Sequence, residues 1–367
     1  MGLTHKVTEG VSIIEFEYEG ISEKHITVTA MDGESLDCII EKLDNAVGKS
    51  QIVFQIAFGA CEIFTSHPNL MTNGRGHKPR IAWVSGETEK NPVSGIYAFA
   101  LNGCPVTTLY DEEEIIGYKY NDRFSEYIYL SGIFSTDSNA YEEEQAKSCF
   151  DKTKKILLKN DMNIKNLVRT WFYNNDILKW YKQFNNVRTK FYTGNGIIGS
   201  IIPASTCIGG ANPHNKALIM GLIALKPLNP SLVQIKEVES PLQDTARTYG
   251  SMFSRAVEVS TSCFKKLYIS GTAAINKDGS SIHTESIQDQ IKYSFDVVKN
   301  ILITNGMAFS DVTRAFAYFR EKEHIKYFNE YMNSNGIINS QVITTNNTIC
   351  REDLLFEIEL DAIQISS

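Results

Sequence analysis

The sequence lacks the features that would place the protein in a membrane or outside the cell. No hydrophobic run approaches the roughly 20 residues of a membrane-spanning helix, and the residues after Met1 have no apolar signal-peptide core. The seven cysteines stand singly, without a Cys-x-x-Cys pair or a paired Cys/His spacing, at Cys38, Cys61, Cys104, Cys149, Cys207, Cys263 and Cys350. We therefore expect a cytoplasmic protein with reduced thiols, no membrane partner and no structural zinc.

Positive charge is scarce as well. The 367 residues include 36 Lys and Arg against 43 Asp and Glu, and the resulting net charge of −7 argues against a general nucleic-acid surface. The glycine-rich stretch 208–214 has neither the lysine of a P-loop nor the spacing of a dinucleotide-binding loop, so it predicts a turn. These patterns lead us to expect neither a cofactor nor a metal site.

What the sequence does contain is the same pattern twice. With Gln145 aligned on Gln290, the identical pairs that follow are Lys147 and Lys292, Phe150 and Phe295, Asp151 and Asp296, Lys154 and Lys299, Met162 and Met307, Arg169 and Arg314, and Tyr173 and Tyr318. Upstream, Tyr129-Leu-Ser-Gly132 resembles Tyr268-Ile-Ser-Gly271. A fixed offset with so many identities indicates a duplicated unit. Two copies of one small fold can share a cleft in which only one copy keeps the chemistry.

Each copy alternates strands and helices. The first predicts strands at 127–134, 167–173 and 217–225, a helix at 141–160, and a second helix from the cap residue Asp176 to Gly194-Asn-Gly196. The second predicts strands at 267–271, 312–319 and 354–363, and helices at about 286–305 and about 322–334. This order predicts an α+β fold in which helices cover one face of a mixed sheet.

The chain is accordingly divided into four segments. Residues 1–120 form an N-terminal extension with strand-like runs at 51–58 and 80–85, and its role is unassigned. The two tandem sheet-plus-helix units occupy residues 121–227 and 263–367, and residues 228–262 connect them.

The order of these motifs resembles the RidA/YjgF superfamily, whose units have a chorismate-mutase-like fold. Three motifs resemble its chorismatase branch more closely: Tyr249-Gly-Ser-Met-Phe-Ser-Arg-Ala256, Ser270-Gly-Thr-Ala-Ala274 and Cys350-Arg-Glu-Asp-Leu-Leu-Phe-Glu357. The stretch Arg169-Thr-Trp-Phe-Tyr173 is similar to that branch too. The resemblance implies cofactor-independent cleavage of the enolpyruvyl ether of chorismate, which gives pyruvate and a dihydroxycyclohexadiene carboxylate or a hydroxybenzoate.

The same resemblance assigns roles to particular residues. Glu357 falls at the position of the acid, Arg255 and Ala256 fall on the substrate-cleft motif with Gly271 in the next one, and Cys350 falls where the product outcome is tuned. The sequence also departs from the branch, because only Arg188 of an expected Cys-x-Gly-Arg pattern survives at Asn185-Asn-Val-Arg188. We therefore expect a divergent member whose substrate can differ from chorismate.

The chemistry of an enol ether explains why a glutamic acid is suitable at position 357. Protonation of the methylene carbon limits the rate and creates an oxocarbenium ion, so a carboxylic acid with a raised pKa is a suitable donor. In strict alternation Glu357 and Glu359 share a face of their strand; the plain alternative is that both lie on the solvent face of an edge strand. The first copy aligns Gly221 with Glu357 and Ile223 with Glu359, so that this face is apolar there and acidic in the second copy.

Affinity for a small anionic substrate must come from arginines, whose planar forks bind carboxylates with two hydrogen bonds. Arg255 and Arg188 are candidate ligands, and the alternative for Arg255 is a surface charge. Arg169 and Arg314 are equivalent across the copies, which favours a structural ion pair. Tyr173 lies at a strand end, where a phenol can donate to substrate, although core packing is the simpler interpretation.

Two other functions remain open. Ordinary RidA proteins act on imines and enamines with the arginine of a Pro-Ala-Arg signature; here the two copies have Pro203-Ala204-Ser205 and Ser340-Gln341-Val342, so both lack it. A non-catalytic protein that binds a small ligand is the third possibility. RidA proteins are trimers with clefts between subunits, and by analogy a covalent pair with an extra segment predicts a monomer or a small homo-oligomer.

Overall fold

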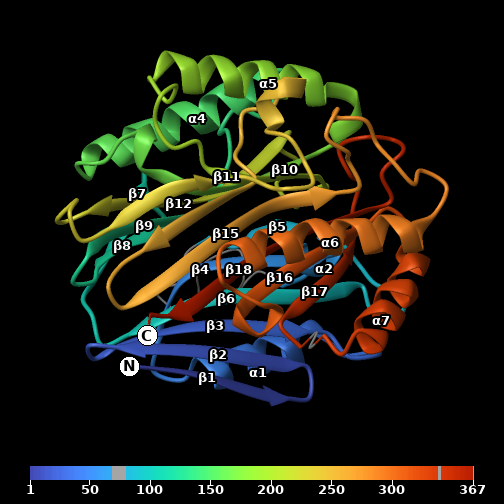
Figure 1. Ribbon diagram of the computed structural model, residues 1–367, viewed down its shortest axis with the longest axis horizontal. Coiled ribbons are helices and arrows are strands. Elements are labelled where there is room, and N and C mark those ends of the chain that lie inside the picture. Colours follow the sequence, from blue (N-terminus) through green and yellow to red (C-terminus); the bar gives the residue numbers. More distant parts are fainter. Residues whose placement is uncertain (68–79, 338–339, 367) are drawn as a thin grey trace.

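The protein is described by a computed structural model that covers residues 1–67, 80–337 and 340–366. These residues form three six-stranded mixed sheets, and the long helices lie on the outer faces of the sheets (Figure 1). The α+β fold with helices covering one face of each sheet is therefore confirmed. Among the described residues, no helix is long and apolar enough to cross a membrane.

The first sheet is built from the N-terminal segment. Its elements are β1 (Gly2–Thr8), β2 (Val11–Tyr18), β3 (Ile21–Thr29), α1 (Leu36–Val47), β4 (Gln51–Gly59), α2 (Cys61–Thr65), β5 (Ala82–Val84) and β6 (Val93–Asn102). The strands lie in the order β1-β2-β3-β6-β4-β5. The last strand, β6, is inserted between β3 and β4 and is antiparallel to both.

The second sheet repeats this plan. Its elements are β7 (Val106–Asp111), β8 (Glu114–Asn121), β9 (Ser125–Ile133), α4 (Glu142–Lys159), a 3-10 turn (Ile164–Asn166), β10 (Leu167–Asn174), α5 (Ile177–Gly194), β11 (Ala204–Gly209) and β12 (Leu218–Pro227). The strand order is β11-β10-β12-β9-β8-β7, with β12 between β9 and β10.

The third sheet has the same plan again. Its elements are β13 (Gln234–Val238), β14 (Ala256–Ser260), β15 (Phe264–Ala273), α6 (Ile287–Thr304), β16 (Val312–Phe319), α7 (Ile325–Ser334), β17 (Val342–Asn346) and β18 (Phe356–Ile365), with 3-10 turns at Ala246–Tyr249, Phe309–Asp311 and Lys322–His324. The order β13-β14-β15-β18-β16-β17 places β18 between β15 and β16.

The chain therefore holds three copies of one unit, whereas the sequence predicted two copies and an extension. Residues 2–102 are a complete unit with the same strand order as the others. The unit boundaries also differ from the prediction. Strand β7 and nearly all of β8 lie in the predicted N-terminal extension yet belong to the second sheet, and β13 and β14 lie in the predicted connector yet belong to the third.

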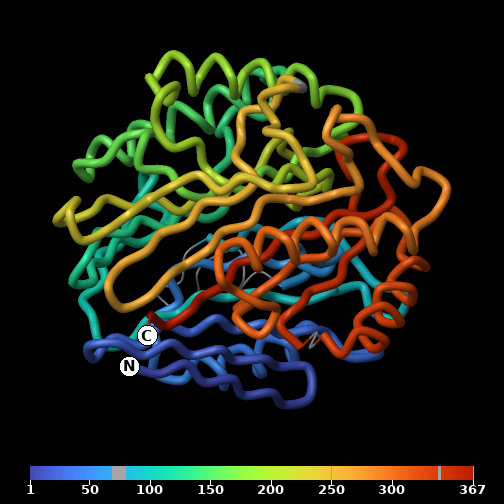
Figure 2. Tube along the Cα trace, viewed as in Figure 1, coloured from blue at the N-terminus to red at the C-terminus, as the bar shows by residue number. Residues whose placement is uncertain are grey.

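The inner faces of the three sheets meet in one central core. Its residues come from all three units, and Phe58, Tyr173 and Tyr318 pack there edge to face, with Phe58 5.9 Å from Tyr173 and 5.8 Å from Tyr318. Each sheet touches the next in a closed cycle, through β5 and β9, β11 and β15, and β17 and β3. Figure 2 shows how the path of the chain encloses this centre. The arrangement leaves one seam between each pair of units.

The identities that revealed the repeat have a structural explanation. Gln145 accepts a hydrogen bond from the Ala217 backbone N–H, and Gln290 accepts one from Leu355, so each glutamine fixes the start of the central strand of its sheet. Asp176 occupies the N-cap position of α5 as predicted, but its side chain does not cap the helix. This residue has φ 51° and makes no capping hydrogen bond; its carboxylate pairs with Lys179 instead.

Candidate active site

A cavity of about 390 Å³ opens at the seam between the second and third units. The second unit contributes Tyr181, Asn185 and Arg188 from α5, and Ser205 and Cys207 from β11. The third unit contributes Phe253, Arg255, Gly271, Cys350, Arg351 and Glu357. The volume lies within the range of about 300–1,000 Å³ that is usual for small-molecule sites.

Five of the seven residues that the sequence singled out line this cavity. They come from distant parts of the chain and are Arg188, Arg255, Gly271, Cys350 and Glu357. The closed cycle of sheets brings them together, because β11 of the second unit lies along β15 of the third. Among the described residues, no group of three or more His, Cys, Asp and Glu side chains is placed to hold a metal ion.

Tyr173 and Ala256 do not line the cavity. Tyr173 is buried at the centre of the three sheets, where it packs on Phe58, as the core-packing interpretation had it. Ala256 is fully buried in the core between the third sheet and its helices. Alternate residues of a strand point to opposite faces, so the backbone that directs Arg255 into the cavity directs Ala256 away from it.

The strand register corrects the alignment of Glu357 with the second unit. Tyr318 pairs with Glu357 and Phe316 with Glu359, whereas the equivalent Tyr173 and Trp171 pair with Ile219 and Gly221. Glu357 therefore corresponds to Ile219, and Glu359 to Gly221. The predicted alignment was displaced by two residues, although the contrast between an apolar and an acidic face remains.

Glu357 is a buried carboxyl group at the inner wall of the cavity. Its residue is 5% exposed, and among the described residues no donor makes a hydrogen bond to its carboxyl group. Burial raises its pKa to about 8, and the neighbouring carboxylate of Glu359 adds to the rise, while Arg169 and Arg255 oppose it. A charged carboxylate without hydrogen-bond donors is poorly stabilised, which favours the protonated form of Glu357.

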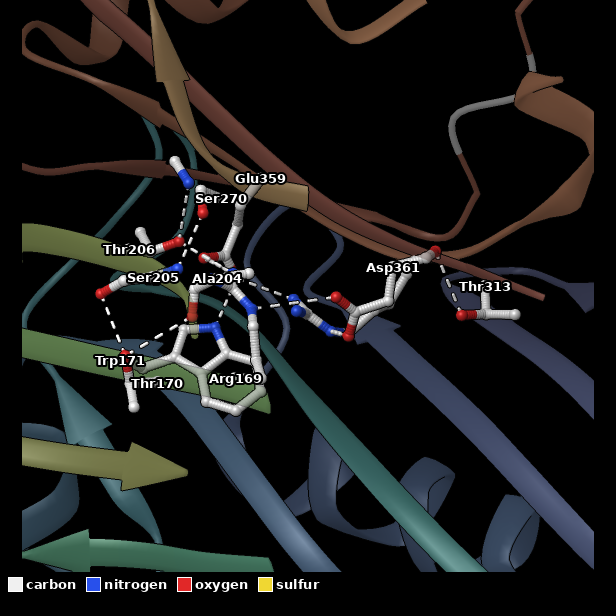
Figure 3. Close-up of polar contacts among 12 residues, drawn as sticks. Arg169, Thr170, Trp171, Ala204, Ser205, Thr206, Ser270, Thr313, Glu359 and Asp361 are labelled. Carbon is white, nitrogen blue, oxygen red and sulfur yellow. Dashed lines mark hydrogen bonds and ion pairs between the residues drawn. The ribbon is translucent and has the colours of Figure 1, made fainter. Parts of the chain in front are cut away.

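Glu359 belongs to a buried ion network, and Figure 3 shows it with Arg169, Trp171 and Asp361. Arg169 donates to Oε2 of Glu359 at 2.5 Å and Arg314 to Oε1 at 2.7 Å. Arg314 also donates to Asp361 at 2.6 Å, and Trp171 donates its indole N–H to Glu359 at 2.8 Å. The structural role that the sequence favoured for both arginines is therefore confirmed.

Gly271 has no side chain, and the carboxyl group of Glu357 occupies the space that a side chain there would fill. A Cβ atom added at this position would overlap Oε1 of Glu357. The backbone N–H of Gly271 donates to Oγ1 of Thr206 at 3.1 Å, and the adjacent Ser270 hydroxyl accepts from the Ser205 N–H at 2.8 Å. These two bonds join β15 to β11 across the seam, so the glycine cannot easily move away.

Gly271→Ala should therefore displace the Glu357 carboxyl group while leaving the fold intact, because the group that must move is the end of a flexible side chain. We expect turnover to fall about tenfold to 100-fold, since small misplacements of a reacting group are costly. Steady-state kinetics with a melting curve would test this. Gly194→Ala is a matched control, because its added Cβ meets no atom within 4 Å. Unchanged turnover in Gly271→Ala would contradict the assignment.

Two arginines from different units form the cationic wall. Arg188 on α5 is 1% exposed, and Arg255 is held by its Nε and Nη2 atoms, which donate to the Asp244 carbonyl at 2.9 and 2.7 Å. Both guanidinium carbons lie over the ring of Phe253, that of Arg188 at 5.7 Å and that of Arg255 at 5.6 Å from the ring centroid. The cavity thus holds two cations together with the Glu357 carboxyl group.

Cys350 lies at the start of a loop that enters β18. The loop is fixed by Gln290, which donates to the Asp353 carbonyl at 2.9 Å, and by Arg320, which donates to the Leu354 carbonyl at 2.9 Å. Burial and the nearby Glu357 raise the pKa of the Cys350 thiol to about 12. The thiol is therefore protonated at neutral pH and shapes the cavity as a small, weakly polar group.

Sequence reasoning missed most of the second unit's contribution. Tyr181, Asn185 and Arg188 are spaced at i, i+4 and i+7, so they share one face of α5, and this spacing was the available signal. Ser205 and Cys207 alternate on β11 and point the same way, but no strand was predicted there.

The fold and the seam site together define a protein of three like sheet-and-helix units with a small-molecule cavity between two of them. Residues 250–364 match the sequence profile of the family described as Endoribonuclease L-PSP. The chain is 25% identical over 254 residues to a chorismatase of Streptomyces hygroscopicus, covering 63% of this chain and 71% of the relative. It also resembles a crystal structure of a chorismatase with a TM-score of 0.62 and 18% identity, covering 85% of this chain and 93% of that one. The chain is therefore similar in sequence to a chorismatase and in fold to a chorismatase structure, and its third unit matches the L-PSP family.

Proposed function

We propose that this protein cleaves the enolpyruvyl ether of chorismate, or of a closely related acid, into pyruvate and a ring carboxylate. The observation that carries the proposal is a buried Glu357 with a raised pKa in a cavity that is also lined by Arg188 and Arg255. The similarity to chorismatases supports the substrate class.

The reaction follows from the placement of the acid. Glu357 transfers its proton to the methylene carbon of the enol ether, and the ether carbon becomes an oxocarbenium ion that the new carboxylate stabilises. Water then adds to this carbon and the resulting hemiketal loses the ring alcohol, so pyruvate and a dihydroxycyclohexadiene carboxylate are formed. In the alternative outcome the ring loses water as well and becomes a hydroxybenzoate.

The arginines account for the acid substrate. A substrate with two carboxylates needs two cations that are already desolvated and oriented, because these lose little on binding. Arg188 and Arg255 come from different units and reach the cavity from two sides. We assign one carboxylate to each arginine.

Arg255→Lys should keep the charge but lose the planar fork. We expect kcat/KM to fall about tenfold to 100-fold, mainly through KM, because a hydrogen bond to a charged group is worth about 1.5–3 kcal/mol. Arg247→Lys is a matched control at an exposed residue that pairs with Glu237. If Arg255→Lys and Arg247→Lys had the same kcat and KM, Arg255 would not be a substrate-binding residue.

The direct test is to incubate the purified protein with chorismate and measure pyruvate with lactate dehydrogenase. Chromatography of the ring product then decides between a dihydroxycyclohexadiene carboxylate and a hydroxybenzoate. Chorismate that is bound but recovered unchanged would indicate a non-catalytic binding protein, and chorismate that is neither bound nor cleaved would exclude this substrate.

Imine or enamine deamination is the second candidate chemistry within the superfamily. The arginine of the Pro-Ala-Arg signature is replaced by Ser205 in the second unit, and Ser205 lines the cavity. Because that arginine would hold the substrate carboxylate, its loss argues against this reaction. If the protein released ammonia from imino acids but no pyruvate from chorismate, deamination would replace ether cleavage as its proposed reaction.

A further inference from the structure

We infer that Glu359 is a positioning residue that keeps Glu357 in its neutral, proton-donating form, an inference that rests on the proposed role of Glu357 as the acid. Glu359 lies two residues further along β18 and shares the same face of the strand. It lies below the cavity and does not line it.

The two carboxyl groups have opposite surroundings. Glu359 is 0% exposed and receives hydrogen bonds from Arg169 at 2.5 Å, Arg314 at 2.7 Å and Trp171 at 2.8 Å. In the described part of the chain, Glu357 receives none. Hydrogen bonds to the charged form favour ionisation, and accordingly the arginines lower the pKa of Glu359 although its burial opposes this. The negative charge is therefore fixed at Glu359.

The balance of buried charges along β18 also favours a protonated Glu357. Glu357, Glu359 and Asp361 lie on one face of β18, and two guanidinium groups face the last two of them. Arg314 bonds both Glu359 and Asp361, while Arg169 bonds Glu359 and has its Nε 3.9 Å from Asp361. Two carboxylates thus balance two cations. A third buried carboxylate would have no partner in this network, and protonation relieves that cost.

Other ionisable groups also face Glu357 from the elements packed around it. These are Arg169 on β10, Cys207 on β11, Tyr181, Arg188 and the exposed Lys182 on α5, Arg255 before β14, and Cys350 and Arg351 on the loop before β18. Arg169 and Arg255 act against protonation of Glu357, whereas burial and Glu359 favour it. After burial, Glu359 is therefore the group that offsets the nearby cations.

The same network also sets the position of the acid. Arg169 donates from Nη2 to Oγ1 of Thr206 at 2.8 Å as well as to Glu359, and Thr206 accepts the N–H of Gly271 at 3.1 Å. Gly271 in turn forms the surface against which Glu357 packs. Since Arg169 and Thr206 belong to the second unit, that unit helps to set both the charge and the place of the acid in the third.

Glu359→Gln tests this inference. The substitution frees Arg169 to attract Glu357, so we expect the pKa of Glu357 to fall by about 1–3 units. Infrared difference spectra between each protein and its Glu357→Gln derivative report this titration without substrate. If chorismate is cleaved, the falling limb of kcat/KM against pH should move to lower pH by the same amount, with KM unchanged and activity recovered at low pH.

Asp361→Asn is the matched comparison, because it removes the same charge two residues further from the acid. We expect a shift in the same direction but smaller. An unchanged Glu357 titration in Glu359→Gln, or equal shifts in both variants, would overturn the inference. If Glu359→Gln does not fold, the titration of Glu357 in Asp361→Asn decides. A Glu357 pKa that does not fall in that variant would then overturn the inference. A shifted titration without chorismate cleavage would refute only the proposed substrate.

Discussion

Glu357→Gln should abolish most pyruvate release. The amide fills the same space and can accept or donate a hydrogen bond, but it cannot transfer a proton to carbon. Removal of a general acid typically costs 10²–10⁴-fold, and we expect a loss in that range in kcat with little change in KM. For the wild type, kcat/KM should fall about tenfold per pH unit above pH 8, because Glu357 has a pKa of about 8 and only its protonated form is active.

The control for this experiment is Glu330→Gln. Glu330 is exposed on α7, so the same chemical change there should leave the kinetics unaltered. Product quantities at several pH values would separate loss of the acid from loss of binding. Pyruvate release by Glu357→Gln at more than about a tenth of the wild-type rate would contradict general-acid catalysis by this residue.

The same substitution should make the protein more stable at alkaline pH. In the unfolded chain Glu357 titrates near 4.5, and in the folded protein near 8. A raised pKa means that the folded state binds the proton more tightly, so the contribution to stability is complete below pH 4.5 and is lost as the pH rises through 8. The difference of about 3.5 units corresponds to about 5 kcal/mol.

Unfolding in urea at pH 5, 7 and 9 would measure this effect. The free energy of unfolding of the wild type should fall relative to Glu357→Gln by about 4 kcal/mol between pH 5 and pH 9, because part of the effect is already lost at pH 5, while Glu330→Gln should follow the wild type. Parallel curves for wild type and Glu357→Gln would show that Glu357 has an ordinary pKa in the folded protein. Loss of activity together with a gain of stability is typical of a group kept in an unfavourable environment for function.

The sequence allowed prediction of the second and third units but not of the first. The register shifts between the fourth and sixth strands place Phe54 of the first unit at the position of Arg169 and Arg314. A buried position of this kind tolerates any side chain that packs, so the identities that reveal a repeat can disappear while the fold remains. The arginines persist because both bind the carboxylates of β18.

The displaced alignment of Glu357 has a geometric cause. A shift of two residues along a strand leaves every side chain on the same face, so the alternation of apolar and polar residues cannot detect it. Only the hydrogen-bonded pairing with β16, which sets Tyr318 opposite Glu357, fixes the register. The register depends on the pairing of two strands, so the sequence of one strand alone does not specify it.

The residues around the acid were harder to predict than the acid itself. Glu359 lies 190 residues from Arg169 along the chain, and Thr206 lies 65 from Gly271. A single sequence indicates which groups are suited to a reaction, but contacts across a seam between units depend on how the units close on each other.

The place of β18 has a consequence for the synthesis of the protein. Each sheet is made of consecutive strands, so each unit can fold soon after it leaves the ribosome. The third sheet, however, has a gap between β15 and β16 until the last strand arrives, and that strand carries Glu357. A nascent chain therefore holds two finished units long before it can perform any chemistry. Prematurely terminated chains would lack the acid and would leave two strand edges open to aggregation.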